Sequence, residues 1–182
     1  MFPDPARHSV KICGITRPEQ AEEIFALGAD AVGINLWPKS KRYMSLAIAG
    51  AALRDVASKN ALVAVLVNAD DVLLDSVING GLFQALQLHG DETPRDVERL
   101  MNRGLNVIKA LQVRDAASLS QIGEFPCAAI LLDAYNPGTY GGGGHAFPWA
   151  LAVRAKDMFP DKHILLSGGL NADNVRQAVQ QT

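Results

Sequence analysis

Seven short apolar segments, each followed by a polar loop and a segment of helical character, dominate the sequence. The segments expected to form strands are 8–13, 29–36, 61–68, 84–90, 106–113, 128–133 and 163–169. Strands that alternate with helices at intervals of about 20 to 30 residues are typical of right-handed βαβ units and a parallel sheet. Short apolar runs bounded by turn residues are buried on both faces of such a sheet.

Helix-start and helix-stop signals lie between these segments. The first helix is expected after a Thr16 cap, with Pro18 in its first turn, and reaches Gly28. The others are expected over 45–58, entered through 69–71, from Pro94, briefly after Asp115, after the glycine run at 141–144, and over 171–181. Pro94 suits the first position of a helix, and Thr93 before it is a good N-cap residue. The whole chain therefore reads as a repeated strand, loop and helix.

A closed barrel and an open doubly wound sheet both satisfy this pattern. The regular repeat, without a long crossover, and the polar or glycine residues at nearly every strand end favour a TIM-type (β/α)8 barrel. The sequence encodes seven βα units, and its 182 residues fall below the usual barrel size of about 200 or more. We therefore expect a single barrel domain over 1–182 that lacks an eighth strand and helix.

Composition agrees with one globular domain, since 48% of the residues are hydrophobic and 20% are charged. The net charge of -2 gives no general attraction to nucleic acid or to an anionic membrane, so an anionic ligand needs a local site. Cys13 and Cys127 are too few and too far apart for a disulfide framework. With no signal-peptide core and no apolar stretch of about 18 residues, we expect a cytoplasmic protein without membrane or nucleic-acid partners.

Two of the strand ends carry groups that can move a proton. Asp133 closes an apolar run, and Cys13 closes the first strand segment between Lys11 and Gly14. In α/β proteins the ligand lies outside the carboxyl ends of the parallel strands, where loops vary on a fixed sheet. The alternatives are a buried, inert Cys13 and an Asp133 that caps the following turn. The sequence favours a catalytic pair, with Cys13 facing Asp133.

Glycines follow the sixth and seventh strand segments, and both sets could approach an anion. Gly141, Gly142 and the two glycines after them allow backbone amides close access to a ligand. Gly168, Gly169 and Asn171 lie where a strand gives way to a helix, which suits a phosphate. A run of four glycines is more often a flexible loop, so the later set is the better phosphate candidate.

Arg42 and His89 also follow strand segments. Arg42 offers a planar fork for a carboxylate, although a loop arginine is usually just solvated. His89 is as consistent with a structural hydrogen bond as with a ligand contact. His, Asp and Cys residues show no metal-ligand spacing, so we expect neither a metal nor another cofactor.

Five ordered motifs together resemble the phosphoribosylanthranilate isomerase family of tryptophan biosynthesis. They are KICGIT from Lys11, WPKSKRY ending at Tyr43, QLHGDE from Gln87, LLDAYNPGTYGG from Leu131 and LSGGLNADNV from Leu166. The resemblance covers essentially the whole chain. Five such motifs at successive strand ends are far more specific than any one of them.

The resemblance implies a cofactor-free isomerase that carries out an Amadori rearrangement of a phosphorylated small molecule. It implies that Cys13 is the general base, that Asp133 is the general acid, and that Arg42 meets the anthranilate carboxylate. It also implies phosphate binding near Gly168 and Gly169. The sequence departs from the family at Gly143, where Thr or Ser is usual, and at Pro148, where Asp or Asn is usual.

Other interpretations remain open at this stage. A chain without an eighth strand could be a truncated, inactive or binding-only remnant of the barrel. Another phosphosugar isomerase or epimerase barrel is also possible, although the epimerases need metal ligands and the histidine-pathway isomerase resembles an Asp at the position of Cys13. Monomer and homodimer are both compatible with the sequence.

Overall fold

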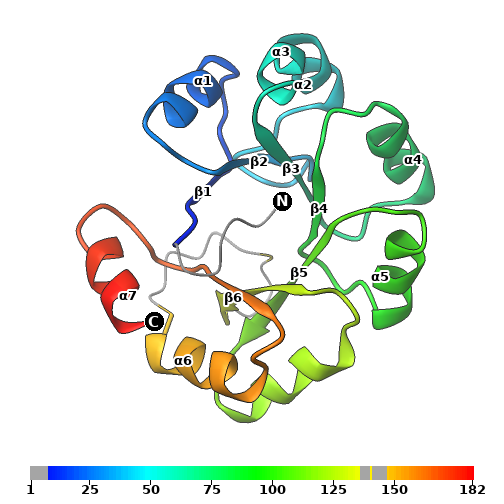
Figure 1. Ribbon diagram of the computed structural model, residues 1–182. Coiled ribbons are helices and arrows are strands. Elements are labelled where there is room, and N and C mark those ends of the chain that lie inside the picture. Colours follow the sequence, from blue (N-terminus) through cyan, green and yellow to red (C-terminus); the bar gives the residue numbers. More distant parts are fainter. Residues whose placement is uncertain (1–7, 136–139, 141–146) are drawn as a thin grey trace. The chain divides into compact units, whose positions relative to one another are not determined.

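The chain divides into two compact units in the computed structural model, residues 1–87 and 88–182. The residues that the structure describes are 8–135, 140 and 147–182. Figure 1 labels the strands and helices of both units. The expectation of one barrel domain over 1–182 stays a prediction.

The N-terminal unit is built on parallel strands. Its strands are β1 (Lys11–Cys13), β2 (Ala31–Asn35) and β3 (Ala61–Leu66), and β4 (Ala85–Leu88) ends at the division between the units. Its helices are α1 (Glu19–Ala26), α2 (Leu46–Ala52), α3 (Arg54–Ala57) and α4 (Asp71–Asn79). Cys13 pairs with Gly33, and Gly33 with Val63. The strand register thus brings the end of β1 beside the middle of β2.

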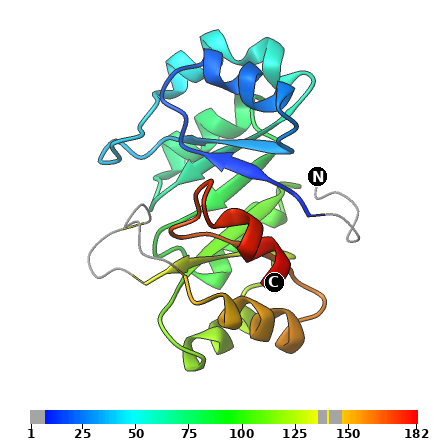
Figure 2. The same cartoon turned by 90° about the vertical axis from the view of Figure 1, so that its left-hand side faces the viewer.

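The C-terminal unit repeats this construction. Its strands are β5 (Val107–Val113), β6 (Ala129–Ala134) and β7 (His163–Leu166), and they are parallel. Its helices are α5 (Pro94–Met101), the 3-10 helix η1 (Ala117–Glu124), α6 (Trp149–Met158) and α7 (Val175–Gln181). Helices α6 and α7 lie side by side (Figure 2).

Apolar side chains from strands and helices fill the core of each unit. In the N-terminal unit they include Val32, Ile34, Leu53, Leu62 and Leu66, and in the C-terminal unit Leu100, Ile108, Leu119, Ile122, Ile130 and Leu132. Strands β3, β5 and β6 are buried along nearly their whole length, as expected of parallel strands covered on both faces. The burial of the strands fixes the positions of the loops that follow them.

Within each unit the described strands pair in chain order, β1 with β2 and β2 with β3 in one, and β5 with β6 and β6 with β7 in the other. Each segment predicted to be a strand contains one, and each is followed by helical structure. The α/β class with seven parallel βα units, the construction of TIM-type proteins, is therefore confirmed. The Thr93 cap and the Pro94 helix start are confirmed as well.

Three predicted boundaries differ from the structure for local reasons. The helix expected over 45–58 is interrupted at Leu53, a fully buried residue with φ of -111° and ψ of 6°. Strand β7 stops before Gly168 and Gly169, whose φ values of +90° and +66° cannot continue a strand. Helix α7 starts four residues later than expected, because the Asn171 side chain holds a turn in front of it.

In the part of the chain that the structure describes, every helix is too short or too polar to cross a bilayer.

Candidate active site

Cys13 is the last residue of β1, and its side chain lies against β2. A Cβ atom at Gly33 would come within 2.8 Å of the Cys13 Sγ atom. The absence of a side chain at Gly33 therefore provides the space in which the thiol lies. Cys13 is half-buried and forms no disulfide, so its thiol can exchange a proton.

The Arg42 side chain lies over the turn that follows β1. Its Nη1 atom donates a hydrogen bond of 2.7 Å to the carbonyl oxygen of Cys13. Gly14 permits this approach, since its φ is +79° and a Cβ there would lie 2.8 to 2.9 Å from three side-chain atoms of Arg42. Two predicted site residues from distant parts of the sequence are thus brought together in the N-terminal unit.

Asp133 and His89 form a close polar pair in the C-terminal unit. His89 directly follows β4, Asp133 is the next-to-last residue of β6, and His89 Nε2 lies 3.1 Å from Asp133 Oδ2. Asp133 is only 4% exposed, and the His89 side chain is 12% exposed. The two side chains are therefore held in contact in a largely buried position of the C-terminal unit.

The other carboxylate oxygen of Asp133 is held by the backbone. The amide of Ala134 donates to Asp133 Oδ1 at 3.0 Å. Gly168 passes close by, since a Cβ there would lie 3.1 Å from Asp133 Oδ1 and 3.0 Å from the Ala134 nitrogen. A side chain at position 168 would therefore push against the carboxyl group of Asp133 and the backbone of Ala134.

The turn after β7 uses its polar side chains to hold its own shape. Asn171 Oδ1 accepts hydrogen bonds from the amides of Asp173 and Asn174, at 2.9 and 3.2 Å. Asn174 Nδ2 donates in turn to the carbonyl of Gly169 at 2.9 Å. Asn171 thus fixes the turn next to Gly169, and its predicted contact with substrate stays a prediction.

Two of the predicted site residues, Gly141 and Gly142, lie outside the described residues, and so does Gly143. Pro148 is described, and it stands at the N-cap of α6 without a side-chain hydrogen bond to the helix. An Asp or Asn there could accept one from the first turn. The departure at Pro148 therefore removes a helix cap.

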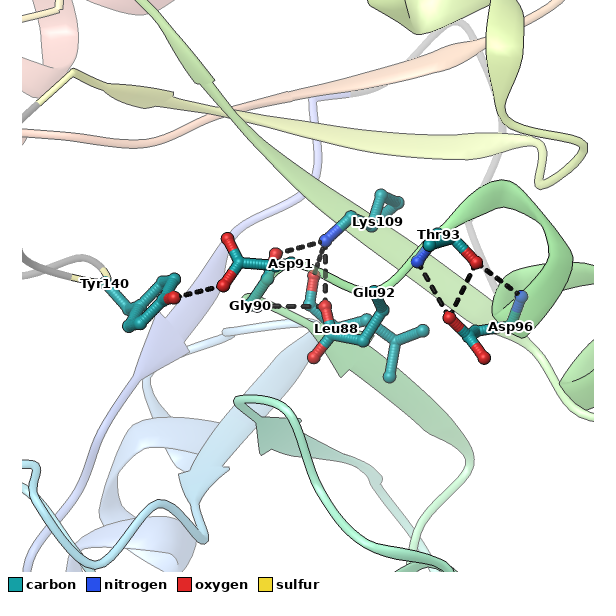
Figure 3. A network of polar contacts seen from close by, with 8 residues as sticks. All are labelled: Leu88, Gly90, Asp91, Glu92, Thr93, Asp96, Lys109 and Tyr140. Carbon is teal, nitrogen blue, oxygen red and sulfur yellow. Dashed lines mark hydrogen bonds and ion pairs between the residues drawn. The ribbon is translucent and has the colours of Figure 1, made fainter.

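Lys109 is a buried cation that reaches the loop carrying His89 (Figure 3). From β5, its Nζ atom donates to the carbonyl of Gly90 at 2.7 Å, to that of Leu88 at 3.4 Å and to Glu92 Oε2 at 2.8 Å. Glu92 Oε2 also accepts from the Gly90 amide at 2.9 Å. The β4–α5 loop is thus fastened to β5 at several points.

Further contacts secure the same loop (Figure 3). The Tyr140 hydroxyl donates to Asp91. The Thr93 amide donates to Asp96 Oδ2 at 2.9 Å, and the Asp96 amide donates to Thr93 Oγ1 at 3.3 Å, so a capping box starts α5. The hydrogen bond from the Thr93 hydroxyl, followed by that from its amide, lowers the pKa of Asp96.

Lys109, Glu92 and Gly33 were not among the residues singled out from the sequence. A lysine within the apolar run NVIKALQV is the signal that could have identified Lys109, because a buried ammonium needs specific partners. Its partner Glu92 follows QLHG in the motif that contains His89. Gly33 carries no comparable signal, since its importance depends on the register of β1 and β2.

The second cysteine differs from Cys13 in its surroundings. Cys127 is 1% exposed, and burial raises the pKa of its thiol. Its thiol donates a hydrogen bond of 3.4 Å to the carbonyl of Ala129 in the core. Within residues 8–135, 140 and 147–182, His, Cys, Asp and Glu form no cluster suited to a metal ion. The described residues thus present a half-buried thiol at Cys13 in the N-terminal unit and a buried carboxyl–imidazole pair at Asp133 and His89 in the C-terminal unit.

The chain is similar to known isomerases over nearly its full length. The family model described as N-(5'-phosphoribosyl)anthranilate isomerase matches residues 10–182. The N-(5'-phosphoribosyl)anthranilate isomerase of Rubrobacter xylanophilus is 42% identical, over 94% of this chain and 82% of the relative.

Solved structures agree with this similarity. Phosphoribosyl anthranilate isomerase from Thermotoga maritima has a TM-score of 0.81 and 36% identity, over 96% of this chain and 83% of that one. A phosphoribosyl anthranilate isomerase in complex with reduced 1-(o-carboxyphenylamino)-1-deoxyribulose 5-phosphate has a TM-score of 0.76 and 34% identity. The match covers 96% of this chain and 82% of that one. With the family model and the curated relative in agreement, the chain belongs to the phosphoribosylanthranilate isomerase family.

Proposed function

We propose that the protein is a phosphoribosylanthranilate isomerase of tryptophan biosynthesis. It converts N-(5'-phosphoribosyl)anthranilate into 1-(2-carboxyphenylamino)-1-deoxyribulose 5-phosphate. The observation that carries this proposal is the buried Asp133 carboxyl group near the end of β6, paired with His89 directly after β4 in a chain of this family. The reaction needs an acid that is shielded from water and held in one orientation.

The rearrangement has three proton-transfer stages. Asp133 gives a proton to the ribose ring oxygen, the bond between that oxygen and C1 breaks, and the anthranilate nitrogen forms a double bond to C1. Cys13 then removes the proton from C2, and the electron pair of that C–H bond forms the C1–C2 double bond of an enolamine. Finally the C2 hydroxyl loses its proton, C1 gains one, and C2 becomes a carbonyl. Atoms and electrons are conserved throughout, as an isomerisation requires.

The contacts of Asp133 suit the role of acid. Oδ1 accepts the Ala134 amide, and Oδ2 faces His89 Nε2 at 3.1 Å. This arrangement fixes the plane of the carboxyl group and gives it a neighbour that can restore its proton after each turnover. We assign His89 to the site on this geometry, as the group that orients Asp133.

The contacts of Cys13 and Arg42 suit a base beside a carboxylate-binding group. The space at Gly33 accepts the thiol, and the guanidinium of Arg42 is oriented by the Cys13 carbonyl. A guanidinium has five N–H donors in a planar fork, so it can donate to this carbonyl and also to the anthranilate carboxylate of the substrate. Cys13 must remain a free thiol to act, which supports a cytoplasmic location.

The substrate phosphate is assigned to the turn after β7 and to the glycines at 141 and 142. Gly168 and Gly169 adopt positive φ values that L side chains rarely adopt, and such backbone can present amide groups to an anion. A phosphorylated ligand is also what the solved relative binds in its complex. Asn171 contributes by fixing this turn.

The test is turnover of freshly prepared N-(5'-phosphoribosyl)anthranilate, followed by the loss of its anthranilate fluorescence. The unmodified protein should catalyse the reaction, and Cys13→Ala and Asp133→Asn should each lower kcat about 100-fold to 10,000-fold. Circular dichroism should show that both variants remain folded. Cys127→Ala is the matched control, because it removes a thiol from the core without touching the site. Near-normal kcat in either site variant would remove that residue from the mechanism.

A further inference from the structure

We propose that Lys109 and Glu92 are positioning residues, which hold the β4–α5 loop so that His89 stays within hydrogen-bond distance of Asp133. This inference rests on the proposed isomerase function, since Asp133 is the acid that His89 orients. The contacts of Lys109 are with the carbonyls of Leu88 and Gly90 and with Glu92, on either side of His89. Their contribution comes through the loop, and Figure 3 shows the contacts that join the Lys109 ammonium to Leu88, Gly90 and Glu92.

The burial of Lys109 requires a specific compensation. Lys109 is 2% exposed, in a strand whose other residues are nearly all buried and apolar. An ammonium group removed from water is strongly unfavourable unless acceptors replace its hydration. It has three donors, and three acceptors lie around it, all of them from the short segment between Leu88 and Glu92. The side chain therefore selects one conformation of this segment.

Two of these acceptors lie on either side of His89. The carbonyl of Leu88 precedes the His89 residue, and the carbonyl of Gly90 follows it. Holding both carbonyl groups on one ammonium restricts the backbone dihedrals between them, and with them the direction of the imidazole ring. A displacement of about 1 Å at a group that orients a catalytic residue can cost about 100-fold in rate.

Glu92 completes the arrangement from within the loop. Its Oε2 atom accepts from Lys109 at 2.8 Å and from the Gly90 amide at 2.9 Å, and its side chain is 11% exposed. The carboxylate neutralises the buried ammonium and fastens the amide of the residue after His89. Removal of either charge leaves the other buried without its partner, so both should matter for the position of His89.

The chain provides a matched control for Lys109. Lys162 also donates to two carbonyl groups, those of Phe125 and Cys127, each at 2.8 Å. These carbonyls precede β6, whereas Asp133 lies near the end of that strand, so Lys162 fastens a different edge of the same unit. Lys162→Met should therefore perturb the C-terminal unit without acting on His89.

The experiment is a double-mutant cycle on kcat with His89→Gln. We expect Lys109→Met to lower kcat about 10-fold or more, with a smaller change in KM. In the His89→Gln background the same substitution should lower kcat less than about threefold, because the group it positions is already gone. Lys162→Met should have the same small effect in both backgrounds. Equal fold losses for Lys109→Met in both backgrounds would overturn the proposal and leave a purely structural role.

A second variant and a second readout keep the test decisive if Lys109→Met folds poorly. Glu92→Gln retains an acceptor for Lys109 and should give a smaller, equally His89-dependent loss in kcat. Hydrogen exchange of the Gly90 amide should accelerate in Glu92→Gln and not in Lys162→Met, whether or not turnover is measured. Unchanged exchange would contradict the proposal, whereas absence of turnover in the unmodified protein would contradict the proposed function instead.

Discussion

Lys109 and Arg42 are both cations that donate to backbone carbonyls beside a candidate catalytic residue, and they do so in very different surroundings. Arg42, in the N-terminal unit, is exposed and donates to the carbonyl of Cys13. Lys109, in the C-terminal unit, is 2% exposed and serves the loop that carries His89. Water can replace Arg42 as the hydrogen-bond partner of the Cys13 carbonyl. Water has little access to the buried hydrogen bonds of Lys109.

This difference indicates how stability and activity are distributed over the candidate site. A buried charged contact couples the position of a side chain to the folding of its unit, because breaking the contact leaves a charge without solvent. A side chain in an exposed contact can exchange that contact for one with a ligand, with little loss of folding free energy. We therefore expect the surroundings of Asp133 in the C-terminal unit to be rigid and sensitive to substitution, and the surroundings of Cys13 in the N-terminal unit to be adaptable.

The largest expected effect is on the free energy of unfolding when either cation is removed. Lys109→Met should lower it by about 3 to 5 kcal/mol, because Glu92, whose side chain is only 11% exposed, loses its cation. Arg42→Met should lower it by less than about 1 kcal/mol, since the Cys13 carbonyl can be hydrated. Urea unfolding followed by circular dichroism measures both. Similar losses of unfolding free energy in the two variants would contradict the contrast between rigid surroundings at Lys109 and adaptable surroundings at Arg42.

The next largest effect concerns Gly168 and Gly14, which both have positive φ. Gly168→Ala should cost about 2 to 4 kcal/mol, because its Cβ would meet the Ala134 backbone at 3.0 Å in addition to the dihedral strain. Gly14→Ala should cost about 1 to 2 kcal/mol, because its Cβ would meet the flexible end of Arg42, which can move away. Gly168→Ala should also lower kcat, since Asp133 Oδ1 lies 3.1 Å from the added atom. A larger cost at Gly14 would reverse the expected order.

Much of the fold was predictable because local patterns determine it. The apolar run at 128–133 predicted β6, and its terminal Asp133 is the buried carboxylate of the structure. The signals of Thr93 and Pro94 predicted the start of α5, and a capping box stands there. Such features depend on neighbours in sequence, which a pattern can show.

The contacts within the site were less predictable because they join distant positions. The approach of His89 to Asp133 spans 44 residues, and that of Arg42 to Cys13 spans 29. Both depend on strand register and loop path, which no single segment encodes. The resemblance to a family indicated which residues belong to the candidate site. The structure showed which of them are in contact, namely His89 with Asp133 and Arg42 with Cys13. Lys109 was overlooked because one charge in a strand pattern does not reveal its partner.

A smaller effect is expected from the caps that begin α5 and α2. Thr93→Ala should lower the free energy of unfolding by about 1 to 2 kcal/mol, since it removes a cap that is part of a reciprocal box. Ser45→Ala should cost about 0.5 kcal/mol, because Ser45 accepts a single hydrogen bond of 3.3 Å from Ile48. Thermal unfolding of both variants measures the difference. A greater loss for Ser45→Ala would show that the α5 cap does not strengthen the C-terminal unit.

The smallest effect is a pH dependence that arises from Asp96. The hydrogen bonds from the Thr93 hydroxyl and amide hold the pKa of Asp96 below its ordinary value near 3.8. A carboxyl group with a lowered folded-state pKa contributes stability above its unfolded value, and the contribution is lost as the pH falls through the folded value.

Asp96→Asn should therefore reduce the free energy of unfolding at pH 7 and have a smaller effect below about pH 3. The difference at pH 7 should be about 0.5 kcal/mol or less, because the carboxylate is solvent-exposed and screened. Urea unfolding of both proteins at the two pH values gives this difference. In a Thr93→Ala background it should shrink, since the hydrogen bonds that lower the pKa of Asp96 are weakened. A pH-independent difference would mean that Asp96 supports the β4–α5 loop through its shape alone, without its charge.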